Sequence, residues 1–229
     1  TTSETTVKDN LTVIGASIFN QDSADVDFRV ESNGVNAMFF VDGGANRVGI
    51  GTSSPTELFE VEQSTAGGTT RTKIDNQDNS NAASHSELFI STGGSSGGDP
   101  MVRFNNRVTN FTMGLDNDGD VFRICNSSGD LSSSARLTIT EAGLVGIGTT
   151  APENSLYSQL VVSAATNEGI TIMAESTSAI NALAFGDGSS GNERYRGRII
   201  YDHSSDLMSL DSAGNVFLHI TSAGYLGLG

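Results

Sequence analysis

The chain has 229 residues, including 27 Gly, 3 Pro and no Trp, and 36% of its residues are hydrophobic. Its formal net charge of −15 repels phosphate backbones, and no basic cluster exceeds residues 194–198, so we expect no nucleic-acid partner. No apolar run approaches the roughly 20 residues that cross a bilayer, so we also expect no membrane insertion.

The composition predicts an all-β protein. Gly, Ser, Thr, Asn and Asp favour tight turns, and the apolar residues occur in short runs of a few residues, such as residues 37–41 and 88–90. Each run can bury only a few side chains within its own chain. This pattern favours association with further copies, although a two-sheet sandwich would also satisfy it.

Alternating apolar residues mark the expected strands in chain order. The first part contains two short segments, residues 11–14 and 27–30, with a turn over residues 31–34. Two meanders follow, with strands expected at residues 101–104, 110–115, 121–124 and 136–139, and then at residues 182–185, 197–201, 207–210 and 216–218. Residues 63–68 and 93–100 are rich in Gly and Ser and predict surface loops. Cys125, the only cysteine, is expected to be an inert core residue on its strand.

A repeated turn sequence divides the chain. The repeat comprises Val48, Gly49, Ile50, Gly51 and Pro55 in the first copy, Val145, Gly146, Ile147, Gly148 and Pro152 in the second, and Leu226, Gly227, Leu228 and Gly229 in the third. Its last glycines lie 97 and 81 residues apart, which is the size of a small domain. The spacing predicts three modules, residues 1–51, 52–148 and 149–229, the last of which we expect to continue past Gly229.

The glycines of the repeat have a physical meaning. An apolar residue between two glycines gives a strand with one face free of side chains, so another backbone can approach it closely, and the following Thr-x-x-Pro ends the strand. Two interpretations remain open at this point. Three chains could meet at this face on a symmetry axis, or the motif could be a kinked edge strand within one chain.

The motif strings resemble the shaft modules of bacteriophage tail fibres and tail spikes, which often precede a C-terminal intramolecular chaperone domain. The resemblance rests on DFRVE followed by FVD and VGIGTSSP, on FTMGLDNDGDVFRICNSS followed by ARLTITEAGLVGIGTTAP, and on the opening residues 7–15. It implies an elongated, parallel, partly interwoven homotrimer. Its units would be small antiparallel β-sandwich or meander modules joined at the Gly-x-Gly turns. The implied partners are further copies of the chain and other virion tail or baseplate proteins.

Three other functions share parts of this pattern. A capsid-mounted head fibre would have the same sequence features. A host-glycan-binding adhesin could use Tyr195, Tyr201 and the loop 93–100, because an exposed Tyr beside Arg can stack on sugars, although core or rim packing is the better explanation for these residues. A polysaccharide depolymerase is disfavoured, since the sequence gives no means of locating a carboxylate pair. We therefore predict a virion fibre component that is not an enzyme and needs no cofactor.

Two short segments contain residue types that can bind metal or catalyse a reaction. Asp116, Asp118 and Asp120 alternate as calcium ligands can, but the glycine is fourth in this loop and Ser127 occupies the twelfth position, so a hairpin turn is the better interpretation. His203, between Asp202 and Ser204, imitates a catalytic triad in sequence only. Adjacent residues point in different directions, which favours a solvated turn.

Overall fold

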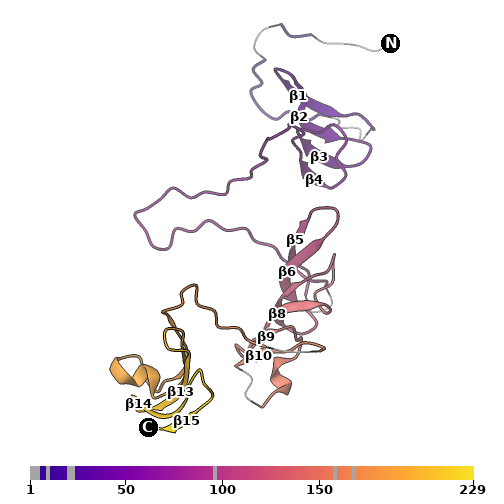
Figure 1. Ribbon diagram of the computed structural model, residues 1–229. Helices are drawn as coiled ribbons and strands as arrows, with labels where there is room; N and C mark the ends of the chain where they lie inside the picture. The colour runs from indigo at the N-terminus through magenta and orange to yellow at the C-terminus, as the bar shows by residue number, and fades with distance from the viewer. Residues whose placement is uncertain (1–5, 9–10, 20–23, 95–96, 157–158, 167–168) are drawn as a thin grey trace. The chain divides into compact units, whose positions relative to one another are not determined.

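The computed structural model describes residues 6–8, 11–19, 24–94, 97–156, 159–166 and 169–229. These residues form fifteen β-strands in three sheets and two short 3₁₀ helices (Figure 1). The predicted all-β class is therefore confirmed. Within the described ranges, no helix has both the length and the hydropathy needed to cross a membrane.

The first sheet has four strands in consecutive order: β1 (Phe28–Ser32), β2 (Val35–Asp42), β3 (Arg47–Ile50) and β4 (Phe59–Val61). The first three form an antiparallel meander, whereas β4 runs parallel to β3. The predicted strand at residues 27–30 is confirmed as β1, with the turn Asn33–Gly34 after it. Residues 11–14, which alternate weakly, form no strand.

The second sheet has six strands in the order β10-β9-β8-β7-β6-β5. These are β5 (Met101–Asn105), β6 (Asn110–Asp116), β7 (Val121–Cys125), β8 (Ala135–Ile139), β9 (Val145–Ile147) and β10 (Leu160–Val162), with the short helix η1 (Pro152–Asn154) between the last two. Strands β5 to β9 form an antiparallel meander, and β10 pairs with β9 in parallel. All four strands predicted for this module are present.

The third sheet is a five-stranded antiparallel meander. It comprises β11 (Ile180–Phe185), β12 (Gly197–Asp202), β13 (Leu207–Ser212), β14 (Asn215–Ile220) and β15 (Leu226–Leu228), with η2 (Gly191–Tyr195) before β12. Again the four predicted strands are present. Positive φ angles at Ala213 and Gly214 form the two-residue β13–β14 turn, which requires left-handed residues.

The sheet boundaries differ from the predicted modules. The first and second sheets continue past Gly51 and Gly148, because each adds a parallel strand after the repeated turn. Two compact units are formed, residues 1–88 and 89–229. The predicted loop at residues 63–68 contains no strand; in the predicted loop at residues 93–100, residues 95–96 lie outside the described part of the chain.

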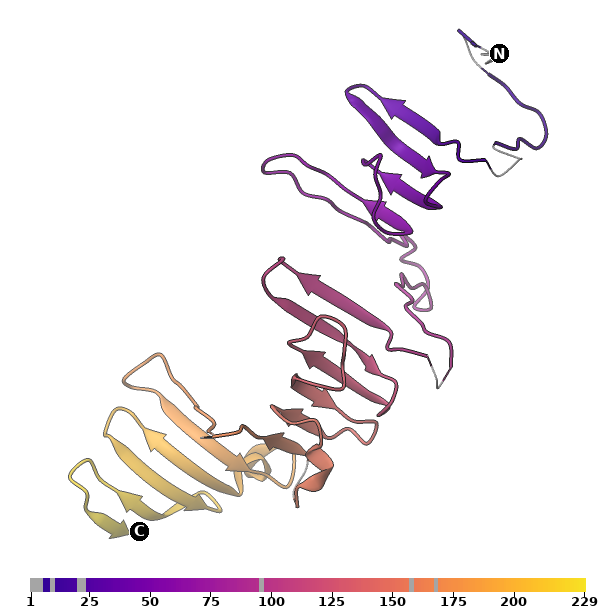
Figure 2. The same ribbon diagram turned by 90° about the vertical axis from the view of Figure 1, so that its right-hand side faces the viewer.

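Each sheet by itself is a single layer of strands (Figure 2). The meander expectation is confirmed, since the strands of each sheet pair in chain order. The buried apolar residues are accordingly few: Ala37, Phe40, Val121, Cys125, Leu131 and Ala135. The small core of the second module lies between one face of the sheet and the loops of the same chain.

Candidate functional site: apolar faces of the three sheets

The two faces of the second sheet differ sharply. Side chains alternate along a strand, so in β7 the residues Val121, Arg123 and Cys125 are buried on one face, whereas Phe122 and Ile124 point to the other. Residues paired directly across neighbouring strands share a face. The register therefore assigns every residue of the sheet to one of two sets.

The set that contains Phe122 is entirely apolar. It consists of Val102, Phe104, Phe111, Met113, Leu115, Phe122, Ile124, Leu137, Ile139, Val145, Ile147, Leu160 and Val162. None of these side chains is fully buried, and Phe104 is 57% exposed. A run of apolar side chains across six strands, uncovered by its own chain, is the kind of surface that marks an interaction site. We call it the second apolar face.

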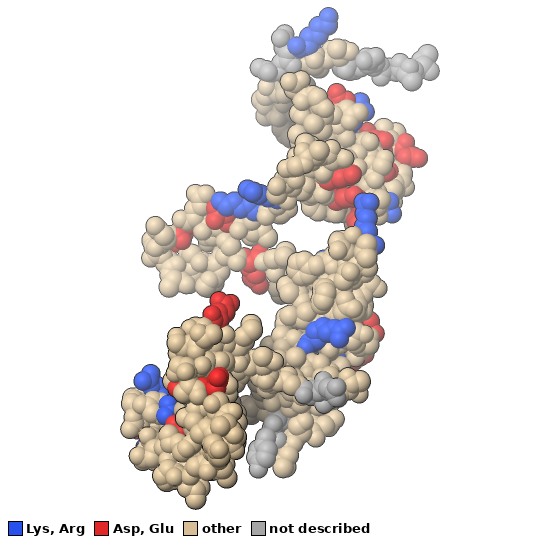
Figure 3. Space-filling view, in the orientation of Figure 1, with Lys and Arg blue, Asp and Glu red and all other residues tan. Residues whose placement is uncertain are grey.

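The other two sheets have the same organisation. The first apolar face consists of Phe28, Val30, Phe39, Val41, Val48, Ile50, Phe59 and Val61. The third apolar face consists of Leu183, Phe185, Ile199, Tyr201, Met208, Leu210, Leu218, Ile220, Leu226 and Leu228. Asn181 lies on the same side of the third sheet and donates a hydrogen bond from its side-chain amide to the Ile172 carbonyl. Charged residues are sparse in the space-filling view, where most of the surface is uncharged (Figure 3).

The opposite face of the second sheet is covered by loops of its own chain. Leu131, from the loop between β7 and β8, is fully buried against Cys125 and Ala135, and Met101 packs beside them. The Thr112 hydroxyl donates to the Ser127 carbonyl at 2.7 Å and ties the same loop to β6. Burial raises the pKa of the Cys125 thiol above its ordinary value. The prediction that Cys125 is a core residue is confirmed.

Arg123 holds this covered face together through a buried ion pair with Asp116. Its guanidinium also donates to the Leu131 carbonyl at 3.1 Å and to the Thr150 carbonyl at 3.3 Å, so one side chain links two loops to the sheet. Asp116 is therefore engaged by Arg123 and accepts a hydrogen bond from the Asp118 amide at 3.1 Å, as in a turn. Within the described ranges, no group of three or more Asp, Glu, His or Cys side chains is arranged so that it could hold a metal ion.

The first glycines of the repeat face their own chain. A Cβ atom at Gly49 would lie 2.5 Å from the Thr52 carbonyl oxygen, and one at Gly146 would lie 2.8 Å from Cγ2 of Thr149. Both glycines belong to the covered faces, so the axial interpretation, in which other chains meet at these glycines, is wrong. The close backbone approach that the glycines permit does occur, but the approaching segment is the turn that follows the motif.

The second glycines make the turn itself. Gly51 and Gly148 have left-handed φ angles of 80° and 75°, and a Cβ at Gly148 would lie 2.0 Å from the Ser163 carbonyl oxygen. Their amides donate to the carbonyls of Ala37 and Arg136 at 3.0 and 3.1 Å. Pro55 and Pro152 then lie buried on the covered faces. In its first two copies, the repeat thus forms a strand and a turn, and the chain then crosses the covered face and continues into β4 or β10.

The two tyrosines proposed for sugar contact lie on opposite faces of the third sheet. Tyr195 stacks under the guanidinium of Arg198, 4.9 Å from the ring centre, and Arg198 pairs with Asp211 on the covered face at 2.6 Å. Tyr201 belongs to the third apolar face, where its hydroxyl donates to Asp206 at 3.1 Å. They do not form one sugar-binding site.

The triad-like residues also separate. The ring centres of His203 and Tyr201 lie 4.9 Å apart, and the backbone amide of His203 donates a hydrogen bond to the Ala179 carbonyl. Asp202 accepts hydrogen bonds from Ser204, at 2.8 Å from the amide and 2.6 Å from the hydroxyl. These bonds lower the pKa of Asp202. The segment is a turn, as its sequence predicted.

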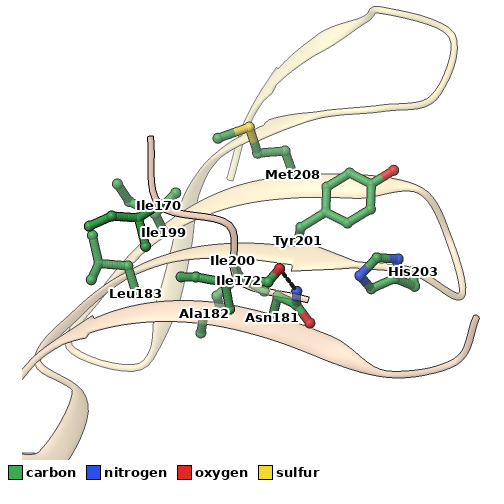
Figure 4. A pocket seen from close by; sticks show the side chains of 10 residues that line it. All are labelled: Ile170, Ile172, Asn181, Ala182, Leu183, Ile199, Ile200, Tyr201, His203 and Met208. Atoms are coloured by element: carbon green, nitrogen blue, oxygen red, sulfur yellow. Dashed lines mark hydrogen bonds between the residues drawn. The ribbon is translucent and has the colours of Figure 1, made fainter. Parts of the chain in front are cut away.

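A groove runs along the third apolar face. The extended segment with Ile170 and Ile172 crosses the strands, leaving a groove of about 400 Å³ between it and residues such as Ile199 and Met208 (Figure 4). Ile170 also lines a smaller hollow of about 280 Å³ with Leu160 and Val162 of β10. The second and third apolar faces are therefore linked through Ile170. The sequence showed the alternation of these residues but gave no sign of what would cover them.

The fold and these faces define a class of protein: an all-β chain of three sheets, each with one apolar face that is largely exposed. No family model and no curated protein matches the chain.

Proposed function

We propose that this chain is a shaft module of a phage virion fibre that assembles as a homotrimer through its three apolar sheet faces. The observation that carries the proposal is the uninterrupted apolar face of the second sheet, thirteen residues on six strands. Face-to-face burial of such surfaces is the usual way for a sheet to complete a core.

The amount of exposed surface supports an assembly. The chain exposes 17594 Å² of accessible surface, whereas a folded monomer of its mass, 23.8 kDa, exposes about 9,900 Å². Forty-two large apolar side chains are exposed among the described residues, against six buried apolar ones. Removing apolar surface from water contributes about 25 cal/mol per Å², so a chain with this surface gains strongly from association.

The number of copies and the biological role rest on the sequence. The VGIGT strings and their flanks resemble phage fibre shafts, in which three parallel chains surround a common axis. In this arrangement the apolar faces point inward, and the loops that carry most of the charged residues point outward. The module then provides length and rigidity to a fibre that supports attachment to the host cell.

Light scattering tests the assembly. The purified chain is expected to have a mass of about 71 kDa, three times the mass of one chain. Phe122→Asp places a charge in the middle of the second apolar face and is expected to reduce the mass to that of a monomer, because an unpaired charge is costly to bury. Ser128→Asp, in an exposed loop, adds the same charge and should leave the mass unchanged. A stable monomer of the unmodified chain would contradict the proposal, and a stable dimer would contradict the trimer.

Electron microscopy tests the role. Antibodies against the chain, labelled with gold, are expected to bind along tail fibres of the intact particle. Labelling restricted to the capsid would instead favour the head fibre, and particles without label would contradict a virion component of either kind.

A further inference from the structure

The outer edge of the second sheet lacks a strand that the third sheet has. In the third sheet, β12 is flanked by β13 on one side and β11 on the other. In the second sheet, β5 pairs with β6 and, among the described residues, has no neighbour on its other side. A row of backbone N–H and C=O groups along β5 therefore remains unpaired, and proteins rarely leave such an edge uncovered.

Strands β5 and β6 correspond to β12 and β13 residue by residue. Both hairpins have a four-residue loop, 106–109 in one and 203–206 in the other. Superimposing the hairpins by their loops places Val102 at the position of Ile199 and Phe104 at that of Tyr201, all four on the apolar faces. It also places the buried Thr112 at the position of the buried Ser209. The two sheets therefore share a plan, and the position of β11 is empty in the second.

A segment suited to that position precedes β5. Residues 87–92 have the sequence Glu-Leu-Phe-Ile-Ser-Thr and are followed by Gly93, just as β11 is followed by Gly186. Aligned in this way, Leu88 and Ile90 take the places of Asn181 and Leu183 on the apolar side. Leu88 is 69% exposed and Phe89 76% exposed. Residues 87–92, all of them described, make no backbone hydrogen bond.

The boundary between the two compact units falls inside this segment, between Leu88 and Phe89. We infer that residues 87–92 form a strand that pairs antiparallel with the free edge of β5 in a second copy of the chain. The register of β11 on β12 predicts that Leu88 lies opposite Phe104 and Ile90 lies opposite Val102. The inference rests on the homo-oligomer of the proposed function and names a pairing within it.

The physical gain comes from three sources that a loop in water lacks. Backbone groups of two segments become paired, as in strand addition to an open sheet edge. Leu88 and Ile90 extend the second apolar face by one strand, and they are removed from water when that face is buried. The facing pairs place an aliphatic side chain beside Phe104 and Val102, a combination that favours cross-strand packing.

Cross-linking between two differently tagged chains tests the pairing. One chain carries Ile90→Cys and the other Val102→Cys, and the two are expressed together and oxidised. Facing residues in an antiparallel pair have Cβ atoms about 4.5–5.5 Å apart, close to the reach of a disulfide. We expect a linked product of about 48 kDa that carries both tags, at least tenfold more abundant than with Phe89→Cys, whose side chain points to the other face.

The outcomes separate this inference from the proposed function. Equal linkage at positions 89 and 90 would overturn the register, and linkage only within single chains that carry both cysteines would overturn exchange between copies. If the protein keeps the mass of an oligomer but no cross-link forms, the strand pairing is contradicted and the proposed function is not. A monomeric mass would overturn both. Amide exchange on the unmodified protein checks the strand independently of any variant: residues 87–92 are expected to be protected, and rapid exchange there would contradict the pairing.

Discussion

Gly146 and Thr149 are three residues apart in the chain and in direct contact in the fold, since a Cβ atom on Gly146 would lie 2.8 Å from Cγ2 of Thr149. The Thr138 hydroxyl, on the strand next to Gly146, donates to the Thr149 carbonyl at 2.8 Å. The turn after the repeat therefore closes on the glycine face of its own sheet. This contact places the second copy of the repeat on the covered face of its sheet, away from the second apolar face.

Gly146→Ala is expected to destabilise the second module by about 1–3 kcal/mol, because the added methyl group forces the Thr149 turn away from the sheet. Chemical denaturation measures the change in the free energy of unfolding. Gly197→Ala is the matched control, since a Cβ there would make only ordinary contacts, the nearest at 3.6 Å. Equal effects for the two substitutions would contradict the role of the turn.

Asp116→Ala should be among the most damaging single changes, at about 3–5 kcal/mol, because it leaves the buried charge of Arg123 without its partner. Urea unfolding of the variant provides the measurement. In the exposed pair Arg196–Asp187, with a separation of 3.1 Å, Asp187→Ala should cost at most about 1 kcal/mol. A small effect at Asp116 would mean that Arg123 is adequately held by the Leu131 and Thr150 carbonyls alone.

Phe122→Ala distinguishes a covered apolar face from an exposed one. If other copies cover Phe122, the substitution should cost about 3–5 kcal/mol, and the melting temperature of the parent should rise with protein concentration. Val108→Ala, at a position that is 89% exposed in a turn, should change stability by less than about 0.5 kcal/mol. Calorimetry at several concentrations makes the comparison, and a melting temperature independent of concentration would argue against the assembly.

Asp78 is expected to titrate well below an ordinary aspartate. Hydrogen bonds from Ser80 and Ser84 to its carboxylate lower its pKa from 3.8 to about 2. A depressed pKa means that these bonds stabilise the loop fully above about pH 4 and are lost as the pH falls towards 2. NMR titration of the carboxyl carbon should show this, and Ser80→Ala should return the pKa towards 3.8. An unchanged pKa in that variant would contradict the assignment.

The Cys125 thiol should be inert in the folded protein and reactive after unfolding. It is fully buried, and burial raises its pKa, so the reactive thiolate is scarce below that pKa. A colorimetric thiol reagent at pH 8 is expected to label less than about a tenth of the native protein in the time that labels all of the denatured protein. Fast labelling without denaturant would show that the loop carrying Leu131 opens readily.

The sequence by itself determined the class of fold, most of the strands and the repeat, although residues 37–41 of β2 were expected only as an apolar run. Alternation along residues 121–125 and the glycine-rich turns act locally, so they can be read without knowing what lies elsewhere. The short strands β4 and β10 escaped prediction because three residues carry too little pattern. Their parallel pairing depends on the left-handed turns at Gly51 and Gly148, which bring distant residues together.

Tertiary structure alone decided which face of each sheet is covered. Alternation places Phe122 and Arg123 on opposite faces of the sheet. It does not indicate that the loops carrying Leu131 and Thr149 pack on the face that contains Arg123. It likewise could not show that the Gly49 and Gly146 side meets its own chain, or that Tyr195 and Tyr201 are separated by the sheet. These outcomes depend on which loop packs on which face, where packing and hydrogen bonding select among arrangements that the alternation along a strand leaves equivalent.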